Sequence, residues 1–192
     1  MIFVLIGAGL TVVLMATAGL VYLRATGLDA MAQPGALETW VARAARRVAV
    51  PSAIRTMANP TPKSAESVAD GMAHFADHCA VCHANDGSGD TEMGRGLYPK
   101  APDMRLDTTQ QLSDGELFYI VEHGIRFTGM PGWRTGTTAG EESSWHLVHF
   151  IRSLPTLTAA ELESMKARNP RSPEEIRFEI EEERFLTEGA QK

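Results

Sequence analysis

The stretch Cys79-Ala80-Val81-Cys82-His83 decides the fold of this 192-residue chain. Two residues separate the thiols, which on a helical turn matches the distance between the two vinyl groups of a haem, so each thiol can add across one vinyl. His83 follows directly and is thereby aimed at the iron from the same side, as a proximal ligand. The motif predicts one covalently bound haem c.

Other uses of two neighbouring cysteines fit the sequence less well. A structural zinc site needs four ligands, and no second Cys-x-x-Cys or pair of histidines occurs at suitable spacing. A redox-active dithiol of the thioredoxin type belongs in a βαβ context, for which the chain shows no pattern. Cys79 and Cys82 are also the only cysteines, which excludes a disulfide scaffold.

The second axial ligand must approach the opposite face of the haem, after the chain has passed around its edge. Met130 is the candidate, in the loop Thr128-Gly129-Met130-Pro131-Gly132-Trp133. Its thioether is a soft ligand that raises the reduction potential relative to two histidines. Met93 and Met104 are rivals, but they lie in the loop that should still enclose the proximal side.

Residues 64–155 predict a compact domain of at least three helices. One runs into the cysteine motif, and a capping box at Ser113–Glu116 opens a second. The third is an apolar stripe that stops at Pro155. The connecting loops are rich in Gly and Pro and show no alternating strand pattern, so we expect an all-α fold.

Cys79–His83, the Gly-Met-Pro loop at Met130 and the flanking helices together resemble a class I mono-haem cytochrome c. The resemblance covers about residues 64–155 and implies a cytochrome c-like helical haem domain. It implies that Gly71 and Phe75 of the first helix cross the last helix near Phe150.

The resemblance also implies that a proline carbonyl accepts the second N–H of His83 and fixes its orientation. Pro99 is the expected acceptor and Pro102 the alternative. The family has glycine directly after the motif histidine, where this chain has Ala84. Trp133 is a further candidate for the haem site.

Like Tyr98 and Arg105, Trp133 either donates a hydrogen bond to a haem propionate or is an ordinary loop residue. The five remaining histidines fall on predicted helices, where solvated or hydrogen-bonded roles are expected.

The first 23 residues, Met1–Leu23, contain no charged side chain and are long enough to cross a bilayer. A cleaved secretory signal is the alternative, because Ala16-Thr17-Ala18 has the small-x-small pattern of a cleavage site. The absence of Lys or Arg at the start and the apolar run beyond Ala18 favour a retained transmembrane helix. Both interpretations carry the rest of the chain across the membrane.

Residues 24–63 hold six basic and two acidic residues. Leu37, Trp40, Val41, Ala44, Ala45 and Val48 fall on one helical face, opposite several arginines. This pattern predicts a short helix that either lies in the headgroup region or docks on a protein surface. Pro51, Pro60 and Pro62 then indicate a linker.

The basic stretch conflicts with the positive-inside rule, which would keep it in the cytoplasm. The haem motif requires the opposite orientation. We therefore expect a single-pass protein of the inner membrane with the haem domain on its periplasmic side.

Residues 156–192 predict an acidic helical tail. A capping box at Thr158–Glu161 opens it, and Ser172 followed by Pro173 predicts the start of another helix. The tail is interpreted either as a solvated helix or as a docking element for a partner.

A haem with both axial positions filled by His83 and Met130 leaves no open site, which predicts electron transfer and not catalysis. Thirteen acidic against six basic residues in 64–155 favour a redox partner with a basic docking face. The alternative is a cytochrome subunit of a larger membrane oxidoreductase. A net charge of −6 argues against nucleic acid as a partner, and no feature supports a haem sensor or peroxidase.

Overall fold

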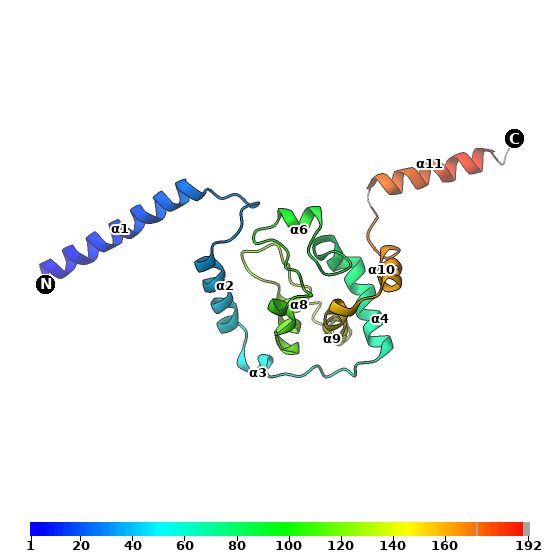
Figure 1. Ribbon diagram of the computed structural model, residues 1–192, viewed down its shortest axis with the longest axis horizontal. Coiled ribbons are helices and arrows are strands. Elements are labelled where there is room, and N and C mark those ends of the chain that lie inside the picture. The colour runs from blue at the N-terminus through cyan, green and yellow to red at the C-terminus, as the bar shows by residue number, and fades with distance from the viewer. Residues whose placement is uncertain (172, 190–192) are drawn as a thin grey trace. The chain divides into compact units, whose positions relative to one another are not determined.

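A computed structural model describes residues 1–171 and 173–189 (Figure 1). Within those ranges the chain forms helices joined by loops, and no strand is present. The predicted all-α fold is confirmed. The chain divides into two compact units, Met1–Ala32 and Gln33–Lys192, which are described separately.

The first unit is built on one helix, α1 (Ile2–Thr26), with 25 residues. By length and composition α1 can cross a membrane, and none of its residues is buried within the protein. It extends three residues past the predicted end at Leu23. The N–H of Gly27, at φ 69°, bonds to the carbonyl of Leu23 and ends the helix.

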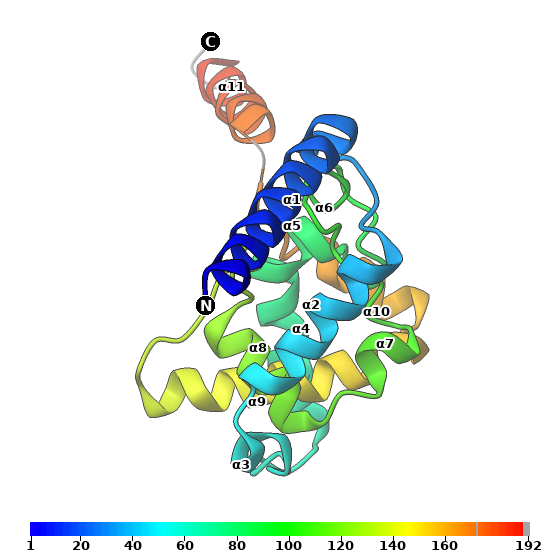
Figure 2. The same cartoon turned by 90° about the vertical axis from the view of Figure 1, so that its left-hand side faces the viewer.

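The second unit is organised around the crossing of α4 (Ala65–His74) and α9 (Thr138–Ser153). Figure 2 shows α9 in yellow, running across the lower part of the view. The backbones touch at Gly71, where a Cβ would overlap the carbonyl oxygen of His146 and lie 3.0 Å from Cβ of Phe150. The rings of Phe75 and Phe150 are 5.1 Å apart, so the expected crossing is confirmed.

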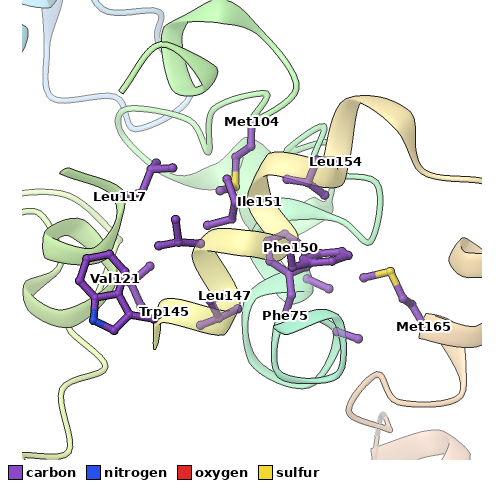
Figure 3. Packing of buried hydrophobic residues seen from close by; sticks show 13 residues of the cluster. Phe75, Met104, Leu117, Val121, Trp145, Leu147, Phe150, Ile151, Leu154 and Met165 are labelled. Carbon is purple, nitrogen blue, oxygen red and sulfur yellow. The ribbon is translucent and has the colours of Figure 1, made fainter. Parts of the chain in front are cut away.

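The core around this crossing is shown in Figure 3. Its largest fully buried side chains come from three segments of the chain: Phe75, Leu147, Val148, Phe150 and Met165. Helix α8 (Asp114–His123) adds Leu117 and Val121, and opens with the predicted capping box between Ser113 and Glu116. Phe118 stacks on Trp145 with ring centroids 4.0 Å apart.

The remaining helices and turns complete the second unit. They are α2 (Ala36–Ala49), α3 (Ser52–Arg55), the π-helical turn Phe75–Cys79, α5 (Ala80–His83), α6 (Glu92–Gly96), α7 (Asp107–Gln110), the 3₁₀ turn Leu154–Thr156, α10 (Ala159–Lys166) and α11 (Pro173–Gly189).

The end of the proline-rich segment is bound to α9. Nδ2 of Asn59 donates to the carbonyl of Trp145 at 2.9 Å, and Nε2 of His149 lies 2.9 Å from the carbonyl oxygen of Thr61. Residues 59–61 therefore pack as part of the helical domain. His149 is one of the five helix histidines, and its hydrogen bond matches the expected structural role.

The first helix of the predicted tail also packs on the domain. Met165 of α10 has no exposed surface and points toward Phe75 and Phe150 (Figure 3). Nδ2 of Asn169 donates to the carbonyl of Ala76 at 2.8 Å. The neighbouring Ser172, predicted to cap the next helix, lies outside the described residues.

Candidate haem-binding site

The cysteine motif lies at the end of a continuous helical segment that starts with α4. The π-helical turn Phe75–Cys79 joins α4 to α5, and the N–H of Ala80 bonds to the carbonyl of Phe75, five residues back. Turns of this kind are rare and often occur at functional sites. The segment ends directly after His83, where Ala84 takes φ 58° and ψ 158°.

Both thiols of the motif are unpaired. Burial raises the pKa of Cys79 to about 12, and burial also raises the pKa of Cys82. Zinc ligands and redox-active dithiols require thiolates, which these environments disfavour. Nor do three His, Cys, Asp or Glu side chains meet as a metal site anywhere in residues 1–171 and 173–189.

The environment of His83 favours the neutral form of its imidazole. Burial lowers its pKa, and an interaction with the backbone of Pro102 offsets part of that effect. A neutral imidazole is the form that binds a metal. Nδ1 of His83 is buried. Among the buried side-chain nitrogens and oxygens of the described part of the chain, it alone has no hydrogen bond of normal geometry.

Pro102, the alternative acceptor, is the backbone group whose interaction raises the pKa of His83, and Pro99 as the acceptor stays a prediction. Residues 101–104 are fixed beside the loop that follows the histidine. The N–H of Met104 donates to the carbonyl of Gly87 at 2.7 Å, and a Cβ on Gly89 would lie 3.1 Å from the carbonyl oxygen of Pro102. The backbone of Pro102 thus packs against the loop that follows His83.

The loop that carries Met130 folds back on the end of α8. The carbonyl of Met130 accepts from the N–H of Ile125 at 3.1 Å, and its own N–H donates to Oγ1 of Thr128 at 3.1 Å. Gly124, at φ 65°, permits the approach, because a Cβ there would lie 2.5 Å from the Met130 carbonyl oxygen. Met130 itself is partly buried.

The two rival methionines have other surroundings. Met104 is only 9% exposed and packs in the hydrophobic core, so its thioether serves as core filling. Met93 is 54% exposed on α6. These positions support Met130 as the sixth ligand.

Contacts on either side of Met130 bring its loop to the proximal part of the domain. A Cβ on Gly129 would meet the side chain of Leu97, with Cγ at 3.1 Å. The ring of Trp133 meets that of His78 edge-on, with centroids 5.2 Å apart, and His78 directly precedes the motif. Trp133 therefore joins the two halves of the candidate site.

Tyr98 and Arg105, the other two candidates for contact with a haem propionate, have partners within the protein. The hydroxyl of Tyr98 donates to Glu38 at 2.6 Å. The guanidinium of Arg105 pairs with Asp103 and with Asp86, each at 2.8 Å. Asp103, in turn, has a lowered pKa because Arg105 donates to it.

One buried polar pair behind the Met130 loop was missed by sequence reasoning. Oγ of Ser144 donates to Oε1 of Glu122 at 2.6 Å, and both residues are buried. The carbonyl of Glu122 also accepts from the N–H of Arg134 at 3.1 Å, which links the pair to the loop. Glu122 follows Val121 on α8, and nothing in the helical pattern separates it from an exposed glutamate.

The residues present fit a haem. They comprise two unpaired thiols at the spacing of the vinyl groups, a neutral imidazole beside them and a partly buried thioether on a separate loop. Residues 66–151 match the sequence model of the family described as cytochrome c oxidase, cbb3-type, subunit III. A comparison with curated proteins finds no match.

Proposed function

Because residues 66–151 form a c-type cytochrome domain, we propose that the protein carries single electrons through one haem c bound covalently to Cys79 and Cys82. The observation that carries the proposal is the junction at the end of α5. There, a partly buried His83, whose pKa is lowered by burial, follows directly on two unpaired thiols.

Each residue of the proposed haem site has its own role. His83 and Met130 are the proposed axial ligands, so that no coordination position remains for a substrate. The backbone of Pro102 orients the His83 ring, as a neighbouring acceptor does for many metal-bound histidines. A haem held in this way supplies one-electron chemistry at iron.

We place the protein in the inner membrane with α1 as its single-pass anchor and the haem domain on the periplasmic side. The apolar composition and length of α1 support the anchor. The need to attach haem outside the cytoplasm supports this orientation. The basic residues that follow α1 would favour the opposite one, and the haem chemistry outweighs them.

Two arrangements of partners fit this proposal. The excess of acidic residues in 64–155 favours a separate redox protein with a basic docking face. The matched family is described as a subunit of an oxidase, which favours membership of a larger membrane complex. Purification from native membranes in mild detergent distinguishes them, because a subunit brings its catalytic partner with it.

The haem assignment is tested on full-length protein purified from membranes. We expect haem to remain on the chain after denaturing electrophoresis and to titrate as a single one-electron centre. After electrophoresis, the double variant Cys79→Ala, Cys82→Ala should show no haem stain, whereas Met93→Ala should stain for haem like the wild type. Haem that separates from the denatured wild-type chain, or an iron centre without reversible reduction, would contradict the proposal.

A further inference from the structure

Helix α2 packs on the haem-binding unit by its polar side. Thr39 and Arg46 are partly buried, seven residues apart and thus on one face, and Val50 at the helix end is fully buried. Burial lowers the pKa of Arg46, consistent with this contact. On the same helix Glu38 accepts the hydrogen bond from Tyr98 at 2.6 Å.

The apolar side of α2 is exposed except at Ala44, which is partly buried. Leu37, Val41, Ala44 and Val48 follow the spacing i, i+4, i+7, i+11 and form one stripe. Leu37 is 73% exposed, Val41 50% and Val48 85%, and Trp40 beside them is exposed as well. Figure 1 shows α2 at the edge of its unit.

This orientation is the reverse of the usual one, in which an amphipathic helix buries its apolar face against the protein. Thr39 comes two residues after Leu37, about half a turn around the helix. The contacts with the domain and the apolar stripe thus occupy opposite sides. The stripe is available to something other than this unit.

Chain connection and charge point to a lipid surface as the occupant. Nine residues, 27–35, separate α1 from α2, so α2 begins at most about 35 Å from the end of α1. Six basic against two acidic residues in 24–63 suit anionic headgroups. Arg43 and Arg47 are exposed on the same helix, and Trp40 beside the stripe is typical of a membrane interface.

We propose that α2 lies on an anionic lipid surface, with Leu37, Val41 and Val48 in the headgroup boundary and its opposite side holding the haem domain. The proposal rests on the anchoring function proposed for α1. In this arrangement one helix contacts the bilayer on one side and the haem domain on the other, and so fixes the domain relative to the membrane plane.

Spin labels on α2 test the arrangement in the haem-loaded, full-length protein. Haem attachment consumes Cys79 and Cys82, so a single introduced cysteine takes the label. Val41→Cys reports on the stripe, and Ala42→Cys, exposed on the same helix but outside the stripe, is its matched control. In vesicles of phosphatidylcholine with phosphatidylglycerol, we expect the Val41 label to be accessible to oxygen and shielded from an aqueous nickel relaxant. The Ala42 label should show the reverse.

A third label separates failure of this proposal from failure of the anchor. Val12→Cys lies in α1 and should report lipid on its own. Lipid at Val12 with water at Val41 overturns the surface proposal alone, whereas water at Val12 overturns the anchoring. Shielding of Val41 that persists in detergent, with dipolar broadening between labels, would assign the stripe to a second copy of the chain and also overturn the proposal.

Charge reversal tests the anionic component. In the Val41→Cys background, Arg43→Glu with Arg47→Glu should remove the shielding, because repulsion replaces attraction between α2 and the anionic surface. With both arginines kept, the Val41 label should be shielded less in vesicles of phosphatidylcholine alone than in the anionic vesicles. Equal shielding in both would overturn the preference for an anionic surface.

Discussion

Ala84 adopts a backbone conformation that is almost confined to glycine. At φ 58° and ψ 158° a Cβ is strained, at a cost of about 1–3 kcal/mol. The conformation reverses the chain directly after His83, the proposed proximal ligand, and the N–H of Gly89 then returns to the carbonyl of His83 at 2.8 Å. Its position therefore explains why the resembling family has glycine there.

Ala84→Gly should stabilise the folded protein. Relief of strain outweighs the greater chain entropy of glycine in the unfolded state, which leaves a gain of about 1 kcal/mol. Denaturant unfolding of the haem-loaded protein measures it. Ala42→Gly, in the middle of α2 where the backbone is ordinary helix, should instead lower stability by about 1 kcal/mol. A lower midpoint for Ala84→Gly would show that this turn is not strained in the haem-loaded state.

Met130→Ala should keep the haem and change its properties. Cys79, Cys82 and His83 are untouched, but loss of the thioether disfavours ferrous iron, so the reduction potential should fall. The methionine-to-iron charge-transfer band of the oxidised protein should vanish, and carbon monoxide should bind to the reduced protein. Potentiometry and absorption spectra measure these changes.

Met93→Ala and Met104→Ala are the controls for this experiment. Both should keep the band and the potential, and Met104→Ala should only destabilise the fold, because its side chain fills the core. If one of these two variants loses the band while Met130→Ala retains it, the ligand assignment is wrong.

At the level of whole elements, the contact of α4 with α9 depends on the absence of a side chain at Gly71. Gly71→Ala would place a Cβ on the carbonyl oxygen of His146, which belongs to backbone and cannot rotate away. We expect a loss of about 1–3 kcal/mol or more in unfolding free energy. Thermal unfolding measures it. Gly96→Ala on α6, where no atom lies within 4 Å, should change stability little, and similar losses in the two variants would contradict a specific contact at Gly71.

The elements that could be predicted are those with local signals. The capping boxes at Ser113 and Thr158 form as expected, since each needs only side chains three residues apart. The π-helical turn has no such local signal, because it depends on which backbone carbonyl accepts the hydrogen bond from the N–H of Ala80. Pro102 and Pro99 lie too close in sequence for spacing alone to separate them.

The candidate site divides in the same way. Cys79, Cys82 and His83 are recognisable because their chemistry fixes their spacing. The pair of Glu122 and Ser144 comes from two helices and exists only through tertiary packing, so no periodicity predicts it. The docking of α10 depends likewise on one methionine meeting a core that is distant in sequence.

For the molecule as a whole, the packed domain extends past the predicted boundary at 155. A chain that ends at Leu157 loses Met165 from the core, and we expect it to be less stable by about 2–5 kcal/mol. A chain that ends at Pro170 keeps Met165 and Asn169 and should unfold near the wild-type temperature. Thermal unfolding of both, loaded with haem, measures the difference, and equal stability would show that α10 adds nothing to the fold.

The turn between Phe75 and Cys79 also has a rotational consequence. In an uninterrupted α-helix, Cys82 would come three full turns after Gly71 and lie on the same side, against α9. The five-residue hydrogen bond from Ala80 to Phe75 shifts the residues beyond the turn by about one position, or roughly 100° around the helix axis. One helical segment can therefore pack on α9 with its first half and turn Cys82 to another side with its second. This rotation corresponds to one whole residue position. Substitutions leave the number of residues in the turn unchanged, so only an insertion or deletion there would alter the rotation.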